Sequence, residues 1–87
     1  MHDAEPIRIV RMRKVSFIDA TGLHNLEGFV TAPLQQGQHI ILSGVNESVY
    51  REIERSGLLE QVGKENVLDH IHKAIKRAEK LSKEYDN

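Results

Sequence analysis

The first hydrophobic run extends from Ile7 to Arg13, where β-branched and other apolar residues are interleaved with three arginines. Such a run favours a β-strand. Because Ile9 and Val10 are adjacent, both faces of the strand are covered at its middle, as in a sheet packed between helices. A second run, His39 to Val45 (HIILSGV), predicts another buried strand, and Gly44 permits a close approach of the backbone at its end.

Helical spacing follows each of these strands. Asp19 is a good N-cap, and apolar residues recur after it at intervals of three or four up to about Ala32, where Pro33 is expected to stop the helix. Asn46 is expected to cap a shorter helix that ends at Gly57, a glycine in the position after the C-cap. The two helices therefore have recognisable ends in the sequence.

The rest of the chain is less regular. Residues 59 to 62 allow a brief strand, and a last helix has an apolar stripe formed by Val67, Ile71, Ala74, Ala78 and Leu81. The basic residues on the other side of this helix are interpreted as a solvated face rather than a lipid-binding face. The alternation of strands and helices predicts an α/β fold, with a layered, mostly parallel sheet and crossover helices.

Composition limits the partners and the chemistry. A chain of 87 residues holds one small domain, and 12 Lys and Arg against 13 Asp and Glu leave a net charge of -1, so nucleic acid is not an expected partner. The chain has no cysteine, which excludes disulfides and thiolate chemistry. The apolar runs are far shorter than the roughly 18 residues of a membrane span, and Met1 to Pro6 lack the apolar centre of a secretion signal, so a soluble piece is expected.

Residues 15 to 23 (VSFIDATGL) resemble the signature loop of STAS domains, the anti-sigma-antagonist fold that is also appended to SulP anion transporters. Three later segments resemble the transporter-attached branch of this family: ILSGVN at 41–46, SGL at 56–58 and ENV at 65–67. The resemblance extends from about Ile7 to Leu81. It implies that residues 1–87 form a single STAS domain with an ordered core of about 7–82.

A complete STAS domain has an N-terminal β-hairpin and a first helix ahead of the strand that begins here at Ile7. By this resemblance the chain is N-terminally truncated and corresponds to the C-terminal two-thirds of a domain. An exposed apolar edge is then expected to be covered by a second copy or by a strand from another chain. Self-association of the isolated piece is the expected outcome.

The resemblance also implies a function. It indicates a regulatory, non-enzymatic interaction module without a cofactor: the STAS portion of a SulP-type transporter for sulfate or another inorganic anion, at the cytoplasmic face of the inner membrane. The expected partner is the parent transporter's membrane domain or a cytosolic regulatory protein. The residues expected to dock this partner are Asp19, Ala20, Thr21, Gly22, Leu23 and His24.

An alternative function depends on Thr21. In the signalling branch of the family the residue before the loop glycine is the phosphoacceptor, and Thr21 stands at that position. A phosphate in the first helical turn meets free backbone N–H groups and the positive end of the helix dipole. The chain would then be a free anti-sigma-factor antagonist switched by phosphorylation of Thr21. In the simpler interpretation Thr21 only helps to cap the helix.

Three further kinds of site are not expected. Asp19, Thr21 and His24 resemble an orienting group, a nucleophile and a base, but so short a chain offers no oxyanion site. A metal site at His70 and His72 is not expected either, because residues two apart on a helix point about 200° apart. The arginines at 8, 11 and 13 can attract phosphate, but guanidinium groups at strand ends usually snorkel to the solvent or pair with carboxylates.

Overall fold

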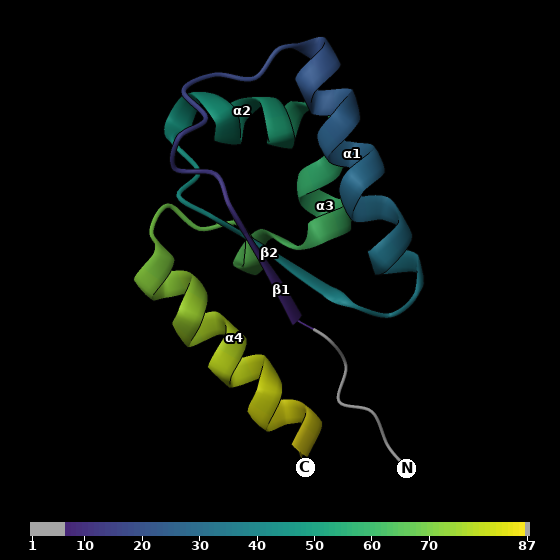
Figure 1. Ribbon diagram of the computed structural model, residues 1–87, viewed down its shortest axis with the longest axis vertical. Coiled ribbons are helices and arrows are strands. Elements are labelled where there is room, and N and C mark those ends of the chain that lie inside the picture. The colour runs from purple at the N-terminus through teal and green to yellow at the C-terminus, as the bar shows by residue number, and fades with distance from the viewer. Residues whose placement is uncertain (1–6, 87) are drawn as a thin grey trace.

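The computed structural model describes residues 7–86. The prediction made for Met1 to Pro6 lies outside the described residues. In chain order the elements are β1 (Ile7–Arg11), α1 (Ala20–Gln35), β2 (His39–Ser43), α2 (Glu47–Arg55), α3 (Leu58–Val62), the 3₁₀ helix η1 (Lys64–Asn66) and α4 (Ile71–Asp86) (Figure 1). The sequence order of strands and helices that the pattern predicted is therefore largely present.

The two strands are parallel and pair from Ile7 opposite His39 to Arg11 opposite Ser43. The far edge of β2 is also partly paired. Leu42 forms a parallel bridge with Val67, and the N–H of Leu68 donates to the carbonyl oxygen of Leu42 at 2.8 Å. The predicted α/β fold with a parallel sheet is confirmed.

Two predictions in the second half of the chain are wrong. Val67 was expected on the last helix, but it is extended (φ -117°, ψ 106°) and lies beside β2, so that α4 begins only at Ile71. Residues 59–62 were expected as a possible strand, but they belong to α3. Leu58, Leu59 and Val62 are all buried there, and their spacing along the chain fits a helical face as well as a short strand.

The end predicted for the first helix is also wrong. Pro33 lies inside α1, which continues to Gln35. Because Pro33 stands near the end of the helix, the helix loses only the hydrogen bond that an N–H at this position would donate to the carbonyl of Phe29. The carbonyl oxygen of Pro33 itself accepts from the N–H of Gln38 at 3.0 Å, and the N–H of Gly37 donates to Leu34 at 3.1 Å. These two bonds form a Schellman motif, which ends the helix.

The predicted end of α2 is confirmed. Gly57 has φ +87°, and its N–H donates to the carbonyl oxygen of Glu54 at 3.2 Å. A residue with a side chain is strained in this left-handed conformation, which is why glycine suits the position after a C-cap. The next residue, Leu58, is fully buried and begins α3 at once.

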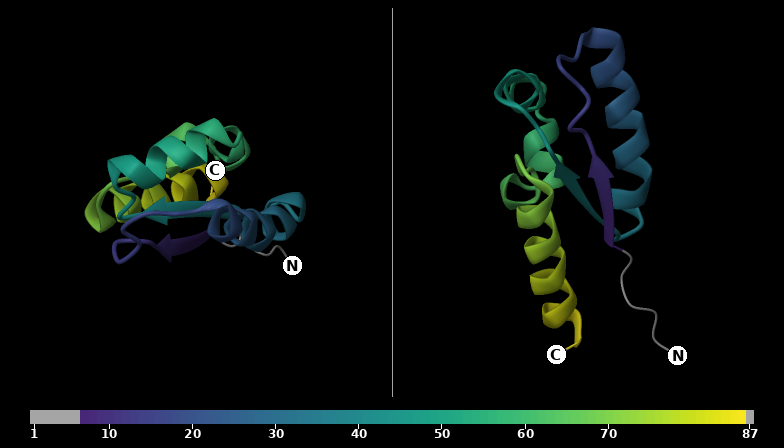
Figure 2. Two further views of the ribbon diagram at one scale, coloured as in Figure 1. Left: turned by 90° about the horizontal axis from the view of Figure 1, so that it is seen from above. Right: turned by 60° about the vertical axis from the view of Figure 1, so that its left-hand side comes forward.

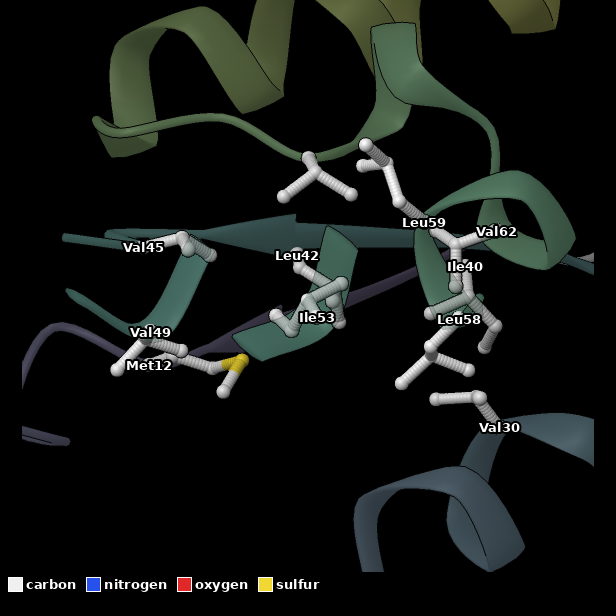
Figure 3. Close-up of a cluster of buried hydrophobic side chains, with 11 residues drawn as sticks. Met12, Val30, Ile40, Leu42, Val45, Val49, Ile53, Leu58, Leu59 and Val62 are labelled. Carbon is white, nitrogen blue, oxygen red and sulfur yellow. The ribbon is translucent and has the colours of Figure 1, made fainter. Parts of the chain in front are cut away.

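Helices cover both faces of the sheet (Figures 1 and 2). On one face Ile40 and Leu42 pack with side chains from α1, α2 and α3, including Val30, Ile53 and Leu58 (Figure 3). On the other face Ile41 packs with residues of α4. Within β1, Val10 joins the first cluster and Ile9 the second. The prediction that both faces of this strand are covered is confirmed.

Gly44, directly after β2, brings two backbone segments together. It has φ +70°, and a Cβ atom added to it would lie only 2.8 Å from the Cα atom of Arg13. The predicted close approach of the backbone is thus confirmed. It fixes the segment that follows β1 against the end of β2, and this segment leads into the loop before α1.

Candidate docking site at the loop before α1

The loop before α1 begins as a continuation of β1. Met12 is buried, and its N–H still donates to the carbonyl oxygen of Ser43 at 2.8 Å. The chain then turns, and the N–H of Val15 donates to the carbonyl oxygen of Met12 at 2.9 Å. The strand predicted to reach Arg13 therefore ends at Arg11, with one more ladder bond beyond it.

Asn46 holds the loop in place from the neighbouring element. Its Nδ2 donates to the carbonyl oxygens of Val15 and Ser16 at 3.1 and 3.0 Å, while its Oδ1 accepts from the N–H of Val49 at 2.8 Å. The sequence indicated the N-cap role but not the contact with the loop. The signal that was missed is the residue type, since among the favoured N-cap residues asparagine has an amide that can donate as well as accept.

Asp19 fixes the other end of the loop. Its carboxylate accepts from the N–H of Gly22 at 2.8 Å, and its carbonyl oxygen accepts from the N–H of Leu23 at 2.8 Å. The predicted N-cap is confirmed. A Cβ atom at Gly22 would lie 3.1 Å from the Cγ1 atom of Ile18, so a larger residue would press on this corner.

The six predicted docking residues lie together at the start of α1, in the upper part of Figure 1. Asp19, Ala20, Thr21 and His24 are exposed, whereas Gly22 and Leu23 are half-buried. Leu23 packs against the larger hydrophobic cluster and so anchors this corner to the core. The structure thus brings the predicted residues together at the surface.

An apolar groove of about 450 Å³ lies beside this corner. Its wall includes Phe17, whose surface is 72% exposed and which is the most exposed of the large apolar residues described. Isolated exposed apolar residues are common, but an exposed aromatic ring beside an apolar groove is typical of a protein-binding surface. The apolar lining consists of Val10, Met12, Val15, Phe17, Ile18 and Leu26.

The arrangement of Asp19, Thr21 and His24 differs from that of a catalytic triad. The carboxylate of Asp19 accepts from the backbone N–H of Gly22. Within residues 7–86 no hydrogen bond joins Thr21 to His24. The exposed hydroxyl of Thr21 lies in the first turn of α1, at the positive end of the helix, beside the carboxylate of Asp19 that already accepts from the N–H of Gly22.

The two histidines near α4 are closer than expected. His70 precedes the helix, and its ring centroid lies 4.7 Å from that of His72. The N–H of His72 donates to Nδ1 of His70 at 3.1 Å. The prediction that their side chains point apart was wrong because only His72 belongs to α4. In the described part of the chain, no three His, Asp or Glu residues are grouped as a metal site requires.

Comparison with known proteins supports the resemblance that the sequence showed to one domain family. The sequence model of the STAS domain family matches residues 5–78. The chain belongs to the STAS domain family. A comparison with curated proteins finds no match.

Two solved STAS-like structures are similar to this STAS domain over nearly its whole length. One is the crystal structure of a sulfate transporter family protein from Wolinella succinogenes, with a TM-score of 0.83, 38% sequence identity, and coverage of 95% of this chain and 68% of that one. The other is the STAS domain of a SulP transporter from Vibrio cholerae, with a TM-score of 0.81, 28% identity, and coverage of 92% and 62%. The predicted STAS fold is confirmed, and the chain spans less than two-thirds of the second relative.

Among residues 7–86 of this STAS domain, no helix combines the length and the apolar character that a membrane-spanning helix needs.

Proposed function

We propose that this STAS domain is a regulatory docking module of a SulP-type transporter of sulfate or another inorganic anion, and that it acts at the cytoplasmic face of the inner membrane. Its docking surface consists of residues 17–24, and its partner is the membrane domain of the transporter. The observation that carries the proposal is the exposed ring of Phe17 beside the apolar groove. The similarity to STAS domains of sulfate transporter family and SulP proteins supports the choice of partner.

Hydrogen bonds anchor the loop at both ends. Asn46 holds its start and Asp19 its end, which lowers the conformational entropy that binding would cost. A regulatory effect then needs only a difference in docking free energy between two states of the transporter. A difference of about 1 to 3 kcal/mol is enough to shift such an equilibrium 5- to 150-fold. No covalent chemistry is required, so the module acts without catalysis.

A binding measurement tests this proposal. The whole chain is titrated against the membrane domain of a SulP transporter from the same genome, reconstituted in lipid nanodiscs. Phe17→Ala is expected to raise the Kd at least tenfold, because a central aromatic anchor typically contributes more than about 1.4 kcal/mol. Ile75→Ala is the matched control, since Ile75 is also exposed (43%) but lies on α4, on the other face of the sheet. Equal losses in the two variants would contradict the proposal.

We also propose that isolated copies associate through the free edge of β1. Because the N–H of Met12 points to β2, strand alternation directs the backbone groups of Ile9 and Arg11 away from β2. No described residue pairs with this edge. Arg11→Pro removes an outward N–H from an exposed position and is expected to turn a dimer into a monomer in sedimentation velocity. A wild-type chain that stays monomeric at all accessible concentrations would contradict this part.

The second candidate function, phosphorylation of Thr21, is favoured by the exposed hydroxyl in the first turn of α1. It predicts stoichiometric phosphate transfer from a kinase-like anti-sigma partner, lost in Thr21→Ala. Thr31→Ala is the control, because the hydroxyl of Thr31 already donates to the carbonyl oxygen of Glu27 at 2.6 Å. Absence of transfer to the wild-type chain would leave docking as the function of this corner.

A further inference from the structure

A small cleft lies at the carboxyl ends of the two parallel strands, between them and the start of α4. Its volume is about 80 Å³, which is room for several water molecules. Ligands of open α/β sheets commonly bind outside the carboxyl ends of the strands. The cleft is formed by different residues from the docking surface, and only Arg11 contributes both to its wall and to the groove beside Phe17.

The cleft is strongly cationic. Arg11 and Arg13 line it, and both also line an adjoining hollow together with Lys14. Of the two outcomes expected for arginines at strand ends, snorkelling or pairing, no pairing with a carboxylate is seen for Arg11 or Arg13 among the described residues. Within the part of the chain that the structure describes, the three ion pairs are Glu47–Arg51, Glu52–Arg55 and Asp69–Lys73. Three neighbouring cations without a carboxylate partner repel one another, and an anion between them relieves this repulsion.

The acidic residue in the wall of the cleft, Asp69, has a cationic partner of its own. Asp69 accepts a salt bridge from Lys73, with 2.9 Å between its Oδ1 and the lysine Nζ. This hydrogen bond and the positive charge of Lys73 lower the pKa of Asp69 below its ordinary value. The carboxylate therefore stays ionised, and the charge of Lys73 beside it offsets part of its attraction for Arg11 and Arg13.

The cleft also offers neutral hydrogen-bond donors. His70 lines it, and because Nδ1 of His70 accepts from the N–H of His72, the neutral ring carries its proton on Nε2. Ile71, the first residue of α4, lies at the positive end of a 16-residue helix. Guanidinium groups, an imidazole N–H and a helix start together match the oxygen atoms of a tetrahedral anion.

We propose that this cleft binds a small tetrahedral oxyanion through Arg11, Arg13 and His70. Free sulfate or phosphate and the phosphoryl group of a nucleotide share this chemistry. The arginines bind the oxygens by charge-assisted hydrogen bonds, and the volume of the cleft limits the bound part to one such group. The site does not depend on the docking function proposed above.

Amide NMR titrations of the whole chain at constant ionic strength test the site, with sodium sulfate, sodium phosphate, AMP and sodium chloride as probes. Saturable shifts are expected at residues 11–14, 43–44 and 70–71 with the oxyanions and not with chloride. If AMP binds more than about tenfold tighter than phosphate, a nucleotide is the source of the group; equal affinity identifies the free ion. Shifts that stay linear with sulfate, phosphate and AMP overturn the proposal.

Matched variants distinguish specific anion binding in the cleft from non-specific electrostatic attraction of anions to the surface. Arg13→Gln is expected to weaken sulfate binding about tenfold, whereas Arg8→Gln removes the same charge from an exposed position of β1 outside the cleft and should change it less than about twofold. Equal weakening by both variants overturns the proposal. Phe17 lies outside the cleft, so Phe17→Ala should weaken docking and leave sulfate binding unchanged. This result would show that anion binding is independent of the docking function.

Discussion

At the residue scale, two single residues determine how the loop of the proposed docking surface is held. Asn46 caps α2 and holds the loop before α1, and Gly44 leaves room for the backbone of Arg13, which a Cβ atom would approach to 2.8 Å. The sequence predicted the cap and the close approach, because both depend on local residue type. The link from Asn46 to Val15 spans 31 positions, and no local pattern predicts such a contact.

Substitution of Asn46 separates its two roles. Asn46→Ser keeps an N-cap but cannot reach the carbonyl oxygens of Val15 and Ser16, whereas Asn46→Ala loses both functions. Asn46→Ala is expected to be less stable than Asn46→Ser by about 1 kcal/mol in urea unfolding. Both variants should show faster amide hydrogen exchange in residues 15–18. Unchanged exchange there would mean that Asn46 does not hold the loop.

Two glycines are expected to respond to alanine with opposite signs. Gly44→Ala introduces a Cβ atom 2.8 Å from Arg13 at positive φ, and should destabilise the fold by about 2 to 4 kcal/mol. Gly28→Ala is the control: this glycine lies inside α1 with no atom within 4 Å of the added Cβ, so the change should stabilise by about 0.5 to 1 kcal/mol. Thermal unfolding of both variants checks the signs.

At the element scale, helices with local signals were predicted well and segments shaped by tertiary contacts were not. The starts of α1 and α2 follow from Asp19 and Asn46, whose caps are local. In contrast, α3 has only five residues, and its helical form depends on burial rather than on propensity. Val67 continues the apolar spacing of α4 in sequence, but its pairing with Leu42 across 25 positions overrides that pattern.

A test of this explanation uses α3 itself. Leu58→Ala should destabilise the chain by about 2 to 5 kcal/mol, because the side chain is fully buried in the larger cluster. Glu60→Ala changes an exposed residue of the same short helix and should stay within about 0.5 kcal/mol of the wild type. If guanidinium unfolding gave equal losses for the two variants, burial would not be what stabilises α3.

At the scale of the whole molecule, two regions of the surface differ in their chemistry. Apolar residues gather in the groove beside α1, and cations gather at the ends of the strands near α4. The common position of residues 19–24 was predictable because the signature loop is contiguous in sequence, and their docking role stays a prediction. The groove and the cationic cleft were not predictable, because each joins segments that are distant along the chain. The cleft depends in addition on which arginines have no carboxylate partner.

The most direct measurement of the central claim is a hydrogen-exchange footprint of the complex between this STAS domain and the reconstituted SulP membrane domain. The account predicts slower exchange at residues 15–24 and in the first turns of α1, where Phe17 and Thr21 are exposed in the free chain. Exchange in α4 should not change. Protection confined to α4, or a complex that forms without protecting residues 15–24, would contradict the account.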